Sequence, residues 1–140
     1  MHIELSIETA DKMKFHAEKI FPNEACGFFY GEDIDQTRKI VDALSITNSQ
    51  QGDQRRRFEI SSKDYLNAEL YADHHRLKLL GIYHSHPNHP AIPSEYDRVK
   101  ALPFFSYIII SVLNNESKEM KSWILNEEQK FIEEIITIKN

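Results

Sequence analysis

Two histidines separated by one residue, His84 and His86, are the side chains of this sequence best suited to binding a metal ion. They end the apolar segment 80–86, which Pro87 terminates, and this pattern predicts a strand. Side chains alternate between the faces of a strand, so both imidazoles point to the same side. Two imidazoles about 7 Å apart along one face can converge on a single ion. Such a pair also occurs without a metal, so the spacing alone leaves both interpretations open.

An acidic segment, Ser-Glu-Tyr-Asp at 94–97, follows the histidines closely. Residues 87–93 contain three prolines in seven positions and are therefore predicted to form a loop. A short helix after this loop could bring Asp97 back as an oxygen ligand, leaving the fourth position of a zinc site open for water. Taken alone, a serine followed three residues later by an acid indicates a helix capping box. Together, the two motifs favour a catalytic zinc centre.

Other candidate residues have simpler explanations. His89 lies in the proline loop and could be a further ligand, but its polar and proline neighbours indicate a solvated position. His74 and His75 fall on a predicted helix, where neighbours point about 100° apart, so no shared ion is expected. Cys26 lies in an apolar strand and is expected to pack there rather than act as a nucleophile.

The elements that must position these residues are strands interspersed with helices. Strands are predicted at 3–5, 26–30, 39–46, 58–60, 80–86, 107–113 and 121–125. One helix is predicted to begin after a cap at Ser6 or Thr9 and to end before Pro22. Two more are predicted over residues 62–79 and from Ser94 to about Leu102. Residues 132–138 fit neither period cleanly and are expected to form a helix or a strand. The pattern predicts a single domain over residues 1–140 with a mixed α+β (α/β) fold, a central mixed sheet flanked by helices.

Composition and charge exclude several classes of protein. The chain has 140 residues, of which 41% are hydrophobic and 28% charged, as expected for a globular protein. Its net charge of −5 argues against nucleic-acid binding. No apolar run approaches the ~20 residues of a membrane span, and the single cysteine excludes an internal disulfide and a multi-cysteine zinc site. Without a secretory signal at its start, the protein is expected to be cytoplasmic and to bind neither nucleic acid nor membrane.

The joint motif resembles the signature of the JAMM (MPN+) metalloprotease family. The matching residues are His84-Ser85-His86-Pro87, Pro93-Ser94 and Asp97, together with Glu24-Ala25-Cys26-Gly27 upstream. The resemblance covers most of the chain, weakens toward the C-terminus, and is closest to the stand-alone prokaryotic members. It implies the JAMM/MPN fold, which is related to the cytidine deaminase-like architecture.

The resemblance also implies roles for five residues. One zinc per chain would be bound by His84, His86 and Asp97, while Glu24 would deprotonate the water and Ser94 would donate a hydrogen bond to the developing oxyanion. General chemistry supports these roles, because zinc lowers the pKa of bound water from about 15.7 to about 7. A carboxylate beside that water can pass its proton to the departing amine. The expected activity is that of a zinc metalloprotease hydrolysing amide or isopeptide bonds.

The substrate implied by the resemblance is the C-terminal Gly-Gly tail of a ubiquitin-like protein, such as a sulfur carrier. Glycine suits such a site, because it lets an extended chain approach the metal without side-chain clashes. The alternatives are a peptidase acting on peptidoglycan or small peptides, as in phage tails, and a non-catalytic MPN scaffold. The sequence names neither the carrier nor the oligomeric state.

The polar segment 48–57 is expected to cover the groove. It contains Arg55, Arg56 and Arg57, three consecutive arginines in an otherwise acidic protein. They form either a clamp for an acidic patch or carboxylate on the partner or a plain solvated turn.

Overall fold

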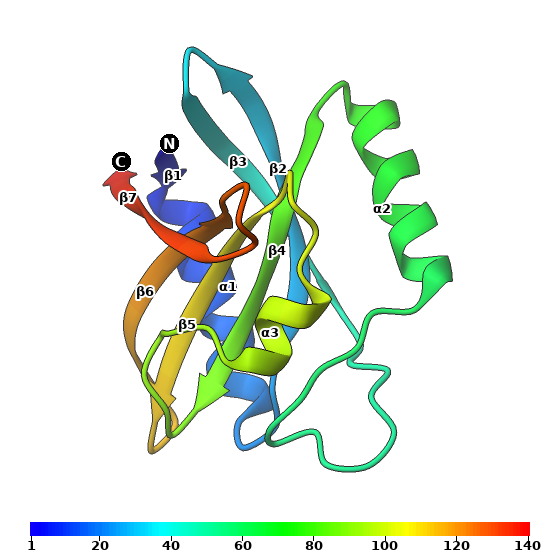
Figure 1. Ribbon diagram of the computed structural model, residues 1–140, viewed down its shortest axis with the longest axis vertical. Helices are drawn as coiled ribbons and strands as arrows, with labels where there is room; N and C mark the ends of the chain where they lie inside the picture. The colour runs from blue at the N-terminus through cyan, green and yellow to red at the C-terminus, as the bar shows by residue number, and fades with distance from the viewer.

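Seven strands and three short helices make up the chain, and a computed structural model describes all 140 residues (Figure 1). The mixed α+β character predicted from the sequence is confirmed. None of the helices combines the length and the apolar character needed to cross a membrane. The elements are β1 (His2–Ser6), α1 (Ile7–Ile20), β2 (Cys26–Ile34), β3 (Thr37–Ile46), α2 (Ser62–His75), β4 (Lys78–Pro87), α3 (Glu95–Lys100), β5 (Ser106–Leu113), β6 (Glu116–Leu125) and β7 (Phe131–Lys139).

The strands form one sheet that closes on itself. In the order β1-β3-β2-β4-β5-β6-β7 each strand pairs with the next, and β7 pairs with β1 in parallel to complete a barrel. The pairs β1–β3 and β4–β5 are also parallel, whereas the other pairs are antiparallel. The sheet is therefore mixed, as predicted. Its closure, which satisfies the backbone groups that two edge strands would expose, was not predicted.

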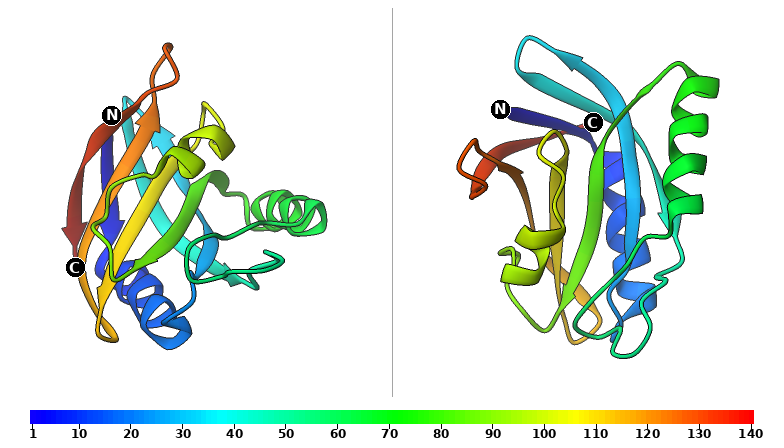
Figure 2. Two further views of the ribbon diagram at one scale, coloured as in Figure 1. Left: turned by 60° about the horizontal axis from the view of Figure 1, so that its bottom comes forward. Right: turned by 45° about the vertical axis from the view of Figure 1, so that its right-hand side comes forward.

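The two longer helices cover opposite faces of this sheet (Figure 2). Helix α1 packs through Ala10, Met13 and Ala17 into a core that includes Phe29 of β2. Helix α2 packs through small residues onto the other face, in a cluster that includes Phe28, the neighbour of Phe29. Because successive strand residues point to opposite faces, β2 contributes to both cores, and its six buried residues form the continuous run seen in the sequence.

Local details of the predicted elements differ from the structure. Helix α2 ends at His75 rather than at 79, because Arg76 adopts a left-handed conformation (φ 55°) that terminates it. Residues 58–60 join no strand, because the backbone of Glu59 forms its hydrogen bonds with Asn48 and Ser49 instead. Residues 132–138 belong to strand β7, held between β6 and β1.

Candidate metal centre

The end of β4 and the start of α3 bring His84, His86 and Asp97 together. The two Nε2 atoms lie 3.2 Å apart, and Oδ2 of Asp97 lies 3.4 Å from Nε2 of His84 and 3.1 Å from Nε2 of His86. In a tetrahedral zinc site with bonds of about 2.0–2.1 Å, ligand atoms are separated by about 3.3 Å. These three atoms therefore have the spacing that one zinc ion requires, and we call them the ligand triangle. No other group of three such side chains lies this close.

Neighbouring groups hold each imidazole in the orientation that a metal ligand needs. Nδ1 of His86 lies 2.9 Å from the carbonyl oxygen of Pro90, to which it donates its hydrogen, leaving the lone pair of Nε2 for a metal. The His84 ring stacks on Phe58 with 4.5 Å between centroids, while its own Nδ1 is buried without a partner. Burial lowers the pKa of His84 in spite of the nearby Asp97, which favours the neutral ring that binds metals.

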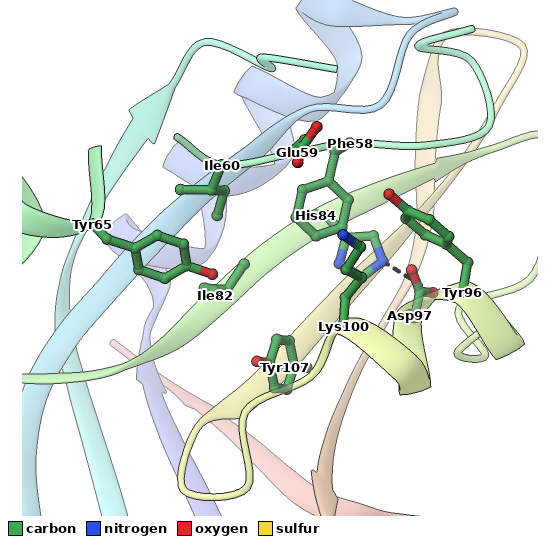
Figure 3. A pocket seen from close by; sticks show the side chains of 10 residues that line it. All are labelled: Phe58, Glu59, Ile60, Tyr65, Ile82, His84, Tyr96, Asp97, Lys100 and Tyr107. Atoms are coloured by element: carbon green, nitrogen blue, oxygen red, sulfur yellow. Dashed lines mark ion pairs between the residues drawn. The ribbon is translucent and has the colours of Figure 1, made fainter. Parts of the chain in front are cut away.

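Asp97 serves the helix cap and the ligand triangle with the same oxygen. Its backbone N–H donates to Oγ of Ser94 at 3.0 Å, and its Oδ2 accepts from the Ser94 N–H at 2.9 Å, which completes the predicted capping box. Burial by itself raises the pKa of the Asp97 carboxyl, but the two histidines and the Ser94 amide outweigh it and lower that pKa. The cap therefore holds an ionised oxygen toward both histidines, and Figure 3 shows its contact with His84.

Glu24 lies in the turn after α1 and is 5% exposed. Its Oε1 is buried without a hydrogen-bond partner, and it shares a cavity wall with His86 and Ser94. Burial, together with the charges of Asp97 and Asp53, raises the pKa of Glu24 to about 9. A carboxyl with an unpartnered oxygen and a raised pKa beside potential metal ligands has the properties of a group that handles protons.

Asn48, which sequence reasoning missed, holds the backbone of Glu24 in place. Its Nδ2 donates to the carbonyl oxygens of Glu24 and Arg57, both at 3.1 Å, and its Oδ1 accepts from the Glu59 N–H. The Glu24 N–H donates to the Gln54 carbonyl at 2.7 Å, so hydrogen bonds from residues 48–60 hold both the N–H and the carbonyl oxygen of Glu24. Nothing in the local sequence distinguishes Asn48 from the polar residues around it.

Replacing Asn48 with Asp is expected to lower the free energy of unfolding by about 1–3 kcal/mol. A carboxylate keeps the acceptor for Glu59 but cannot donate to the carbonyls of Glu24 and Arg57, and its charge would face both oxygens. Urea unfolding measures the change. Asn67→Asp, which adds the same charge at an exposed position of α2, is the control and should shift stability by less than about 0.5 kcal/mol. Equal losses in both variants would contradict the role of Asn48.

Two cavities of different chemistry border the ligand triangle. The first, called the apolar cavity below, has a volume of about 180 Å³ and is shown in Figure 3. Its wall includes His84 and Asp97. The apolar and aromatic side chains around them are Phe58, Ile60, Tyr65, Ile82 and Tyr107. The second, called the basic cavity, has a volume of about 380 Å³ and a wall that includes Glu24, Arg56, Arg57, His86, His89 and Ser94. Tyr96 contributes to both.

The remaining candidates lie outside the ligand triangle. His89 lines the basic cavity but is not grouped with the three ligand atoms. His74 and His75 lie edge to face on α2 and belong to no such group either. Burial raises the pKa of the Cys26 thiol to about 12, which opposes formation of the nucleophilic thiolate.

Comparison with known proteins assigns the family. A family model described as prokaryotic homologues of the JAB domain (Prok-JAB) matches residues 7–126. The chain belongs to this family. The assignment confirms the resemblance to stand-alone prokaryotic JAMM/MPN proteins.

Individual relatives of this Prok-JAB protein extend the similarity over nearly the whole chain. It is 30% identical over 118 residues to a desampylase from Pyrococcus furiosus, covering 83% of this chain and 76% of that protein. A solution structure of a Desulfitobacterium hafniense protein has a TM-score of 0.87 at 29% identity, covering 99% of this chain and 93% of the other. A solution structure from Salinibacter ruber has a TM-score of 0.76 at 31% identity, with coverages of 98% and 91%.

Proposed function

We propose that this Prok-JAB protein is a cytoplasmic zinc metallopeptidase that cleaves the amide or isopeptide bond after the Gly-Gly tail of a ubiquitin-like, sulfur-carrier-type protein. The ligand triangle of His84, His86 and Asp97 carries this proposal. Three protein ligands leave a fourth position for water or substrate, which is the arrangement of catalytic rather than structural zinc sites. The 30% identity to a desampylase supports the choice of substrate, and residues 1–140 would form one catalytic domain.

A zinc ion, which His84, His86 and Asp97 would hold, would supply a Lewis acid and make water a nucleophile at neutral pH. In the proposed reaction the carboxylate of Glu24, whose ionised form a nearby metal cation would stabilise, takes a proton from the attacking water and delivers it to the departing nitrogen. The unpartnered Oε1 of Glu24 supports this role. Oγ of Ser94 already accepts from the Asp97 amide, so its hydroxyl hydrogen is free to donate to the carbonyl oxygen as that oxygen gains charge.

The apolar cavity is the proposed binding site for the tail. At about 180 Å³ it is smaller than the pockets of about 300–1,000 Å³ that take drug-sized ligands, and it suits a narrow extended chain. Its wall combines residues 58–60 with His84 and Asp97, so a tail lying there would pass directly beside the ligand triangle. Only residues 101–105 separate α3 from β5, which leaves the carrier free to approach from that side.

A pair of substrates tests the proposed function. The zinc-loaded protein is incubated with a folded ubiquitin-like carrier whose Gly-Gly tail is followed by a reporter, and with a short peptide carrying the same tail. The folded carrier is expected to have a roughly 10-fold or greater kcat/KM, because its remote surface adds binding energy that the peptide lacks. Preference for the peptide would instead identify a small-peptide hydrolase. Cleavage of neither substrate by zinc-replete protein would identify a scaffold.

A further inference from the structure

The basic cavity has a charge opposite to that of the protein as a whole. The chain carries a net charge of −5, yet this wall contributes two guanidinium groups, Arg56 and Arg57, and Glu24 is its single acidic residue. Neither arginine forms an ion pair within the protein. Two unpaired arginines beside His86 and Ser94 therefore create a site that favours an anion.

Arg57 is held at this wall before any ligand arrives. Its guanidinium carbon lies 4.5 Å from the centre of the Tyr96 ring, a cation–π contact between the segment 48–60 and helix α3. Its carbonyl oxygen accepts from Nδ2 of Asn48 at 3.1 Å, which fixes the backbone as well. Because both its side chain and its backbone are already held in place, Arg57 loses little conformational freedom when it binds an anion. The site is therefore preorganised. The neighbouring Arg55 does not line the cavity.

We propose that the basic cavity binds a free carboxylate on the departing residue, so that the preferred substrate carries one amino acid with a free α-carboxylate directly after the scissile bond. This inference rests on the proposed function, with the tail in the apolar cavity and the leaving group in the basic one. The α-carboxyl carbon of such a residue lies about 2.5 Å from the scissile nitrogen, close enough to remain beside His86 and Ser94. An isopeptide-linked lysine presents no carboxylate at that distance.

The proposed cleavage needs only water as co-reactant. The bond between the glycine carbonyl carbon and the nitrogen of the last residue breaks, and the hydroxyl of water stays on the glycine as a new carboxyl group. The second hydrogen of water goes to the departing nitrogen. The products are a carrier that ends in Gly-Gly and a free amino acid, whose carboxylate bonds to Arg56 and Arg57 until it leaves.

Substrates that differ in one charge test this inference. Three folded carriers are compared as substrates of the zinc-loaded enzyme. They end in Gly-Gly-Ala with a free carboxylate, in Gly-Gly-Ala-carboxamide and in Gly-Gly-Asp-carboxamide. We expect kcat/KM for the free carboxylate to exceed that for alanine carboxamide by about 10–100-fold, the range for a hydrogen bond to a charged group. Added salt should reduce this ratio, because it screens exposed charges.

Variants of the arginines locate the effect. The ratio of carboxylate to carboxamide cleavage is measured within each protein, so a partial loss of folding or zinc cancels. Arg56→Gln/Arg57→Gln should bring the ratio to within about 3-fold of unity, and Arg56→Gln alone, which leaves the Arg57–Tyr96 contact in place, should lower it by about 3–10-fold. Arg55→Gln removes the same charge outside the cavity and should keep the ratio of the wild type.

Each contrary outcome has a distinct meaning. Equal cleavage of the free carboxylate and the carboxamide by the wild type overturns the inference and leaves the proposed function intact. Preference for the aspartate carboxamide assigns the cavity to a side-chain carboxylate and overturns the α-carboxylate. A ratio retained in the double variant overturns the assignment to Arg56 and Arg57. Failure to cleave any of the three carriers with zinc bound overturns the proposed function itself.

Discussion

Asp97→Asn is expected to leave the protein with little bound zinc and to lower kcat/KM by about 10³-fold or more, the scale seen when a group that touches the reacting atoms is removed. The amide oxygen of asparagine can still accept from the Ser94 N–H, so helix α3 keeps its cap. The negative charge that balances the cation is lost, however, and an amide oxygen is a poorer zinc ligand than a carboxylate. Elemental analysis of the purified protein and hydrolysis of the carrier fusion measure the two effects.

Two further variants separate the proposed ligand role of Asp97 from its role in the capping box. Asp97→Ala removes the metal-facing oxygen and also the acceptor of the Ser94 N–H, and losing that hydrogen bond should lower the free energy of unfolding by about 1 kcal/mol. Glu95→Gln removes a carboxylate from the same helix turn, where it pairs with Arg98 at the surface, and should retain zinc and activity. Full zinc content in Asp97→Asn would contradict the proposed ligand set, whichever activity accompanied it.

Glu24→Gln is expected to keep normal zinc content and to lose about 10²–10⁴-fold in kcat, the range attributed to general acid–base catalysis. Glutamine has nearly the same shape as glutamate, and the backbone hydrogen bonds of residue 24 to Asn48 and Gln54 do not depend on its side chain. It cannot accept the proton of water or return it to the departing nitrogen. Activity close to that of the wild type at equal zinc content would remove Glu24 from the mechanism.

The same substitution predicts a change in how stability depends on pH. The folded-state pKa of Glu24 is raised above the usual 4.5 to about 9, chiefly by burial. The folded protein thus binds more protons than the unfolded chain between these values, and its stability falls as the pH rises through this window. Relative to Glu24→Gln, the metal-free wild type should lose up to about 1.4 kcal/mol per pH unit between about pH 5 and pH 8.

Denaturant unfolding of both proteins in the presence of a chelator gives the difference directly. Other titrating groups, such as the buried Glu134, are common to the two proteins and cancel in this comparison. A difference that stays constant over the window would show that burial does not raise the pKa of Glu24.

Much of the candidate ligand set could be predicted from the sequence, because it depends on short-range geometry. Alternation along a strand is enough to place His84 and His86 on one face, and the serine-to-acid spacing at 94–97 is enough to predict a helix start. The structure confirms both, together with the mixed sheet. The roles of Glu24 and Ser94 stay predictions, as does the relationship to the cytidine deaminase-like architecture.

Predicted elements were wrong or left undecided where a local pattern competes with distant contacts. Residues 58–60 have the composition of a strand, but their backbone hydrogen bonds go to Asn48 and Ser49. Residues 132–138 suit either period, and only the pairing of β7 with β6 and β1 decides for a strand. The intrinsic preference of a segment for helix or strand is a weak predictor wherever such strand pairing is available.

The sequence alone was enough to identify the family, the candidate ligands and the order of most elements, because these depend on short motifs and local patterns. The three-dimensional structure was needed to show that Oδ2 of Asp97 both caps α3 and faces the histidines, and that Arg56 and Arg57 line the cavity that Arg55 does not. It also decided that Asn48 holds Glu24, 24 positions away. Contacts between distant residues arise from the closure of the barrel and the path of residues 48–60 across it, and no local periodicity carries that information.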